Sequence, residues 1–165
     1  MFAAYETDPV SSYGDAADDT AMWFHPTDET LSLIVGTDKF SGVDVYDLKG
    51  KRIGHYPVGR VNNVDSRADF QLGASKVTLL AGSNRSKYAI DLYTIDPATR
   101  KLTVAGDIRL SGEPYGICMG KLPGQDKITI FVPNKNGTLD HWKVWYDNGF
   151  RSSFVERLNF GSTVE

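Results

Sequence analysis

The sequence predicts an all-β fold made of three four-stranded blades of a β-propeller whose ring is incomplete. A single pattern occurs three times: an apolar run, a polar turn with one cation, and an alternating strand that ends in an aromatic residue. The three copies are Leu33–Tyr46, Leu79–Tyr93 and Ile130–Trp142. Their cations, Lys39, Arg85 and Lys135, are separated by 46 and 50 residues, which is about the length of a propeller blade. Apolar residues alternate with a period of two, as in strands, and no convincing helix pattern occurs.

The chain begins with a polar stretch, residues 1–17, that we interpret as an irregular lead-in to one partial propeller domain, 18–165. In the first blade, about 18–59, the buried run AMWFH is closed by Pro26, and a glycine-centred turn, DLKGKR, separates the last two strands. The predicted strands are Ala21–His25, Ser32–Gly36, Val43–Leu48 and Ile53–Val58.

The second and third blades, about 60–111 and 112–165, repeat this plan with the turns DPATRK and Asp147–Gly149 before their last strands. The second blade is predicted at Asn63–Phe70, Val77–Gly82, Ala89–Ile95 and Leu102–Ile108, and the third at Tyr115–Met119, Lys127–Val132, Thr138–Tyr146 and Ser153–Leu158. Because propellers close with four to eight blades, three blades look like half of a ring. We expect either further C-terminal blades or a neighbouring propeller domain to complete it.

One end of this half-ring collects charged side chains. Neighbouring strands of a blade are antiparallel, so the loop that leads into the first strand and the turn after the second strand lie at the same end. The turns carry the three cations, and the leading loops are Asp15–Asp19, Arg60–Asp65 and Glu113–Gly116. Cations that converge on an axis suit a ligand with several anionic groups, above all a phosphate ester. The alternative is that each cation is a solvent-exposed residue at the end of a strand and binds no ligand. Asp18 and Asp19 could bind a hard cation through oxygen, or simply form a solvated turn.

Composition excludes several classes of protein. The chain has 165 residues, 41% hydrophobic, with a formal net charge of −3, and it lacks the long basic run of a general nucleic-acid binder. No apolar stretch approaches the ~20 residues of a membrane span. No signal peptide is visible at the start, and the lone Cys118 forms no internal disulfide, so the sequence leaves the compartment open.

Nucleophile motifs are also missing. No arginine stands six residues after Cys118, as a cysteine phosphatase requires, and no Arg-His-Gly arrangement occurs. We expect His25, His55 and His141 to be strand residues rather than metal ligands, because they fall in different blades. Any hydrolysis is therefore expected to use a metal-activated water.

Seven segments together resemble the β-propeller phytases, the calcium-dependent 3-phytases that act on phytate (myo-inositol hexakisphosphate). They run in the family's order over most of the chain: DDTAMWFHPTD (Asp18–Asp28), LIVGTDKFSGVDVYDLKGK (Leu33–Lys51), GRVNNVD (Gly59–Asp65), AGSNRS (Ala81–Ser86), IDLYTIDPATRKL (Ile90–Leu102), GEPYGICM (Gly112–Met119) and NKNG (Asn134–Gly137). The resemblance implies the N-terminal half of a six-bladed domain, in which a calcium-bridged water attacks phosphorus. It also implies a secreted or periplasmic protein.

The resemblance further implies roles for individual residues. Lys39, Arg85, Tyr115 and Lys135 are the expected catalytic and substrate-binding residues, and Arg60 is a further candidate for substrate binding. The expected calcium ligands are Asp18, Asp19, the backbone of Val64, Asn136 and Glu165. At two positions the chain departs from the family pattern: Asn136 replaces an acidic residue and Phe40 replaces a second lysine.

The first functional hypothesis is therefore a calcium-dependent phosphomonoester hydrolase acting on phytate, present as a partial domain that is weakly active or inactive alone. The alternative is a non-catalytic, incomplete propeller module that binds inositol phosphates or assists a complete phytase domain. A propeller scaffold with neither activity is the third reading. The expected ligand is in each functional case a small phosphate ester, with neither nucleic acid nor membrane as a partner.

Overall fold

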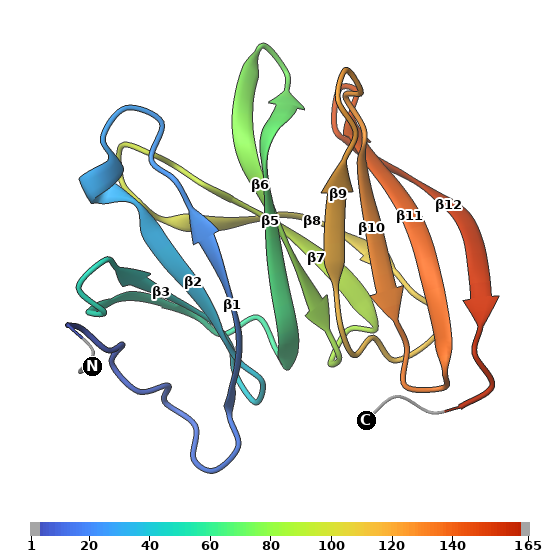
Figure 1. The fold of residues 1–165 in the computed structure, drawn as a ribbon, viewed down its shortest axis with the longest axis horizontal. Coiled ribbons are helices and arrows are strands. Elements are labelled where there is room, and N and C mark those ends of the chain that lie inside the picture. The colour runs from blue at the N-terminus through green and yellow to red at the C-terminus, as the bar shows by residue number, and fades with distance from the viewer. Residues whose placement is uncertain (1–3, 163–165) are drawn as a thin grey trace.

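The computed structural model describes residues 4–162, which form three four-stranded antiparallel sheets in chain order (Figure 1). This confirms the predicted all-β fold of three four-stranded units. The first sheet contains β1 (Ala17–Trp23), β2 (Leu33–Asp38), β3 (Gly42–Asp47) and β4 (Arg52–Tyr56). The second contains β5 (Val61–Leu72), β6 (Ser75–Asn84), β7 (Ala89–Ile95) and β8 (Leu102–Arg109). The third contains β9 (Cys118–Lys121), β10 (Ile128–Pro133), β11 (Thr138–Tyr146) and β12 (Phe150–Asn159).

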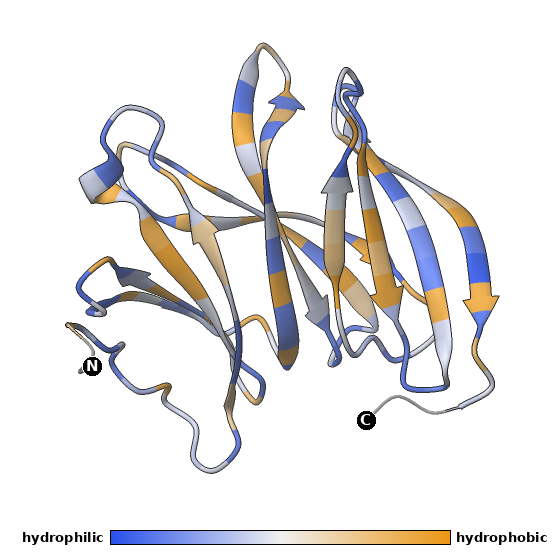
Figure 2. Cartoon of the chain, viewed as in Figure 1, coloured by the Kyte–Doolittle hydropathy of each residue, from blue (hydrophilic) through white to orange (hydrophobic). Residues whose placement is uncertain are grey.

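Two apolar cores hold the sheets together. The first core lies between the first and second sheets and includes Val35, Val45 and Tyr93. The second lies between the second and third sheets and includes Phe70, Ile90 and Ile130. The middle sheet is therefore buried on both faces, whereas β12 is mostly exposed and shows alternating hydrophobic and hydrophilic bands (Figure 2).

The first strands of all three sheets differ from the prediction. β5 (Val61–Leu72) extends beyond the predicted Asn63–Phe70 at both ends. β1 begins at Ala17, so Asp18 and Asp19 lie in the strand, beside an irregularity in its pairing with β2, rather than in the loop before it. β9 begins at Cys118, after Tyr115. Before β9, Pro114 forms only an isolated bridge with Asn134, because proline has no N–H to extend a ladder. The structure also has a short 3₁₀ turn, η1 (Glu29–Leu31), that the sequence pattern did not predict.

The lead-in packs on the first sheet. Val43 and Val45 belong to the core, so the alternation of β3 turns Asp44 and Tyr46 to the opposite face. The segment Asp8–Ser12 follows that face: the Asp8 N–H donates to the Gly50 carbonyl at 2.8 Å, and the Ser12 N–H donates to Asp38 at 3.0 Å. Tyr46 is consequently only 3% exposed.

Among residues 4–162, no helix has the length and apolar character needed to cross a membrane.

Candidate functional site

The three cations occupy equivalent positions in the three sheets. Each follows the second strand of its sheet, and its backbone N–H donates to a carbonyl of the segment that precedes the first strand. The three bonds are Lys39 to Ala16 at 2.9 Å, Arg85 to Arg60 at 2.7 Å and Lys135 to Glu113 at 2.9 Å. Main-chain pairing thus brings each cation beside its leading segment, at the same end of every sheet.

The residue before each cation fixes the turn. Asp38, Asn84 and Asn134 are all fully buried. Asp38 accepts a hydrogen bond from the Phe40 N–H at 3.1 Å, and Asn84 accepts one from the Lys87 N–H at 3.1 Å. Asn134 donates to the Thr138 hydroxyl at 3.1 Å. An Asp or Asn side chain that bonds to its own turn holds the following residue in place, which explains why this pair of residue types recurs.

Lys39 is surrounded by carboxylates of the first sheet. Its Nζ donates to Asp15 at 2.7 Å and to Asp18 at 3.3 Å, and its side chain is 15% exposed. The hydrogen bond with Asp15, aided by Asp18, raises the pKa of Lys39 above its ordinary value. Lys39 therefore keeps its positive charge at any physiological pH.

A second charged group joins the second and third sheets. The Glu113 Oε1 accepts a hydrogen bond from Arg85 Nε at 2.7 Å and forms an ion pair with Arg85 Nη2 at 2.6 Å, and it lies 3.8 Å from Arg60 Nη2. The Tyr115 ring contacts two cations, with its centroid 5.9 Å from the Arg85 Cζ and 4.9 Å from the Lys135 Nζ. The structure thus brings Arg60, Arg85, Tyr115 and Lys135 together around the segment that begins at Glu113.

The predicted metal ligands Asp18, Asp19 and Val64 also lie together, where the first and second sheets meet. Asp18 accepts a hydrogen bond from the Asn62 amide at 3.1 Å. Asp19 accepts from the Asn63 amide at 3.1 Å and from the Val64 N–H at 3.2 Å. Carboxylate and amide oxygens are of the kind that Ca²⁺ prefers, but the ion takes six to eight of them.

These residues fit a calcium ion only as part of a coordination shell. In the described part of the chain, no three acidic, histidine or cysteine side chains come together as a metal site. The Asn136 Oδ1 accepts hydrogen bonds from the N–H and the hydroxyl of Thr138, within its own turn. Glu165 lies outside the described residues.

The two groups are connected by a serine that sequence reasoning missed. The Ser83 Oγ accepts a hydrogen bond from the Asn63 N–H at 3.0 Å and donates to the Tyr115 carbonyl at 3.3 Å. The pairing of Glu113 with Arg85 was also missed, although Glu113 stands in a leading loop that the sequence had marked. The Glu113–Arg85 contact joins side chains from two sheets. The only sequence signal for it is that both residues stand at the same end of neighbouring repeats.

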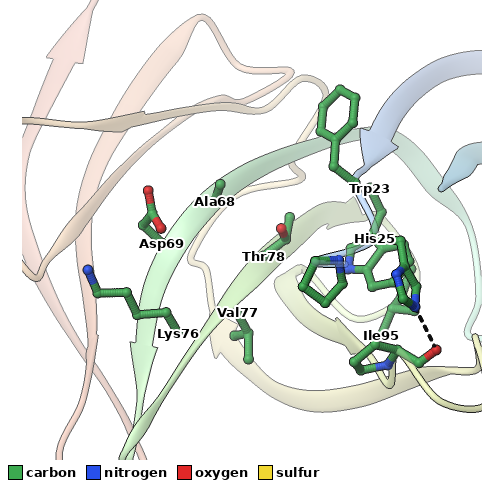
Figure 3. A pocket seen from close by; sticks show the side chains of 11 residues that line it. Trp23, His25, Ala68, Asp69, Lys76, Val77, Thr78 and Ile95 are labelled. Atoms are coloured by element: carbon green, nitrogen blue, oxygen red, sulfur yellow. Dashed lines mark hydrogen bonds between the residues drawn. The ribbon is translucent and has the colours of Figure 1, made fainter. Parts of the chain in front are cut away.

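The hollow drawn in Figure 3 lies elsewhere, at the opposite end of the first two sheets. Its lining includes Trp23, His25 and Lys76, and none of the predicted site residues line it. His25 packs edge-on against Trp23, and its Nε2 lies 3.2 Å from the Pro97 carbonyl (Figure 3). His25 therefore ties the end of β1 to the β7–β8 turn.

Comparison with known proteins identifies the family. The phytase family profile matches residues 1–153. The 3-phytase of Bacillus subtilis (strain 168) is 48% identical over 146 residues, which cover 84% of this chain and 38% of that protein. The chain thus spans well under half the length of this curated relative.

Solved structures show the same fold at low sequence identity. Two crystal structures of BBS1N in complex with ARL6DN, one soaked with mercury and one with lead, match 87% of this chain with TM-scores of 0.57 and 0.56. They are 13% and 14% identical to it, and the match covers 40% and 43% of those chains. At this identity the likeness concerns the propeller-like fold alone. From the family profile and the Bacillus relative, the chain belongs to the phytase family.

Proposed function

We propose that this chain is part of a calcium-dependent phosphomonoester hydrolase that acts on phytate. The observation that carries the proposal is the alignment of Lys39, Arg85 and Lys135, with Tyr115, at one end of the three sheets in a member of the phytase family. Phytate carries several phosphate groups on a small ring, so a substrate of this kind can engage several of these cations at once.

In this proposal the cations bind and orient phosphate oxygens. Lys39 and Lys135 act as point charges, and Arg85 offers the planar fork that matches two oxygens of one phosphate. Arg85 and Lys135 are each held over the Tyr115 ring, and Lys39 is held between Asp15 and Asp18. Groups fixed before the substrate arrives stabilise the negative charge of the transferring phosphoryl group without reorganising.

Calcium is the proposed cofactor, and when bound it supplies an activated water as the nucleophile. Asp18, Asp19 and the backbone of Val64 would contribute some of its oxygen ligands. The other ligands would be Glu165, which lies outside the described residues, and residues of the further blades or neighbouring propeller domain that we propose as partners. The described residues alone are accordingly expected to bind substrate but to hydrolyse it weakly or not at all.

The test is phosphate release from calcium phytate by the full-length gene product. We expect Lys39→Ala and Arg85→Ala each to lower kcat/KM by at least about tenfold, because each removes a charge-assisted contact with phosphate. The matched control is Lys101→Ala, which removes an exposed cation before β8, at the other end of the second sheet. Unchanged activity in both site variants would contradict the proposed role of these cations.

The rival function is phytate binding without hydrolysis. Two observations favour it: Phe40, beside Lys39, is 55% exposed where a second cation is expected, and the Asn136 amide oxygen serves its own turn. Calorimetry of the full-length protein with phytate and Ca²⁺ separates the two functions. Binding with no measurable phosphate release supports the rival, whereas binding with release supports the hydrolase.

A further inference from the structure

We propose that Glu113 is the positioning residue that sets the orientation of Arg85 for phosphate. The effect on ligand binding rests on the proposed function, but the orienting contact itself does not. Glu113 was not among the site residues predicted from the sequence.

One carboxylate oxygen of Glu113 lies close to two nitrogens of the Arg85 guanidinium. Its Oε1 lies 2.7 Å from Arg85 Nε and 2.6 Å from Arg85 Nη2, and the side chains of Glu113 and Arg85 are 27% and 16% exposed. Arg60 Nη2 lies 3.8 Å from the same oxygen, and its side chain is 47% exposed. Of the two arginines, Arg85 is thus the one that is held closely.

The contact occupies only one edge of the Arg85 fork. A guanidinium has five N–H bonds in one plane, and its Nε–Nη2 edge faces Glu113, with a hydrogen bond from Nε and an ion pair at Nη2. The adjoining edge, formed by Nη1 and the second hydrogen of Nη2, makes no hydrogen bond with residues 4–162, so it offers two parallel donors to a phosphate. Glu113 therefore fixes the plane of the guanidinium without blocking the edge that suits phosphate.

The backbone around Glu113 positions the other groups of the site. The Glu113 carbonyl accepts the Lys135 N–H at 2.9 Å, and the Tyr115 N–H donates to the Pro133 carbonyl at 2.9 Å. The segment Glu113–Tyr115 is thus anchored to the turn that carries Lys135. Through its side chain it holds Arg85 of the second sheet, so it fixes cations from two sheets relative to each other.

A carboxylate beside a binding cation could instead act as a brake, because it competes with the phosphate for the positive charge. The two roles predict opposite signs. A brake predicts tighter phosphate binding when Glu113 is removed, whereas a positioning residue predicts weaker binding. Replacement by glutamine separates charge from geometry, because the amide keeps an acceptor oxygen and loses the charge.

The first measurement needs no ligand. In the ¹H–¹⁵N spectrum of the full chain, the Arg85 Nε–H is assigned by its loss in Arg85→Lys. We expect Glu113→Ala to speed the solvent exchange of this N–H by about tenfold, the size of effect that removal of a supporting contact commonly has. We expect Glu113→Gln to keep the exchange slow. The control, Asp107→Asn, weakens the exposed Asp107–Arg109 pair and leaves the Arg85 signal unchanged. An Arg85 signal that is the same in wild type and Glu113→Ala overturns the proposal.

The second measurement is phytate affinity by calorimetry. We expect Glu113→Ala to weaken binding about tenfold, Glu113→Gln to stay within about threefold of wild type, and Glu113→Ala to add little to Arg85→Ala. Tighter binding by Glu113→Ala identifies a brake and overturns the positioning role. If wild type does not bind phytate at all, the proposed function fails, and the exchange of the Arg85 N–H alone decides whether Glu113 orients it.

Discussion

At the scale of single residues, each sheet buries one aspartate on its third strand beside a nitrogen donor. Asp44 lies 2.8 Å from His55 Nδ1, Asp91 lies 2.9 Å from Lys87 Nζ, and Asp140 lies 2.6 Å from Arg157 Nε. All three aspartates are at most 1% exposed. A buried carboxylate that loses its partner is strongly destabilising, which explains why a partner accompanies each of them. In the first two sheets a tyrosine two residues later also donates to the carboxylate, at 3.3 Å in both.

This arrangement predicts a loss of stability in alkali that depends on Tyr46. Burial, together with the nearby Asp44 charge, raises the pKa of Tyr46 from 10.0 to about 12. A pKa that is higher in the folded state gives stability that is complete below pH 10 and is lost as the pH rises toward 12. Urea unfolding at pH 8 and pH 11 should show a smaller decrease in the free energy of unfolding for Tyr46→Phe than for wild type. The control is Tyr13→Phe, because the Tyr13 side chain is 96% exposed. Its free energy of unfolding should decrease between pH 8 and pH 11 by as much as that of wild type. An equal decrease in Tyr46→Phe would contradict the assignment.

At the scale of elements, the lead-in segment Asp8–Ser12 behaves as a cover for the first sheet. Asp8 also accepts the Arg52 N–H at 2.8 Å, and the Arg52 guanidinium donates to the Ser11 hydroxyl at 2.9 Å. The cover leads directly into the site, because the Ser12 N–H bonds to Asp38, the residue before Lys39. Burial acts to raise the pKa of Asp38, but hydrogen bonds such as that from Ser12 outweigh it and lower this pKa.

Gly50 tests how much the docked lead-in contributes. Its φ is +84°, and a Cβ there would lie 2.0 Å from the Glu6 carbonyl oxygen. Gly124 has a similar φ of +72° with nothing within 4 Å of its Cβ position, so Gly124→Ala carries the backbone strain without the clash. We expect Gly50→Ala to lower the free energy of unfolding by about 1–3 kcal/mol more than Gly124→Ala does, and to speed chymotrypsin cleavage at Tyr13. Equal stability and equal cleavage in the two variants would show that the lead-in does not depend on this contact.

At the scale of the whole molecule, the sheets were predictable and the contacts between them were not. Strand positions follow from local signals, such as the alternation of Val43 and Val45 and the Pro and Gly turns. The common end of the three cations follows from antiparallel pairing alone. The Glu113–Arg85 contact, the Ser83 bridge and the docking of Asp8–Ser12 join segments far apart in sequence, and nothing in their local pattern marks them. The early start of β1 was missed because Asp18 and Asp19 have low strand propensity, and their contacts with the second sheet override it.

The stacking of three sheets on two cores predicts a gradient of local stability. β7 is buried along nearly its whole length because apolar cores cover both faces of the middle sheet, whereas β4 and β12 are outer strands with mostly exposed or half-buried residues. Native-state hydrogen exchange should therefore be slowest at Ile90–Tyr93, where exchange requires opening of both cores. It should be fastest in β12, whose amides can open locally by fraying from β11. Phe70→Ala, which opens the second core only, should speed exchange in β10 more than in β2. Equal protection of β7 and β12 would mean that the three sheets open as one unit, and the two cores would then not act as separate contributions to stability.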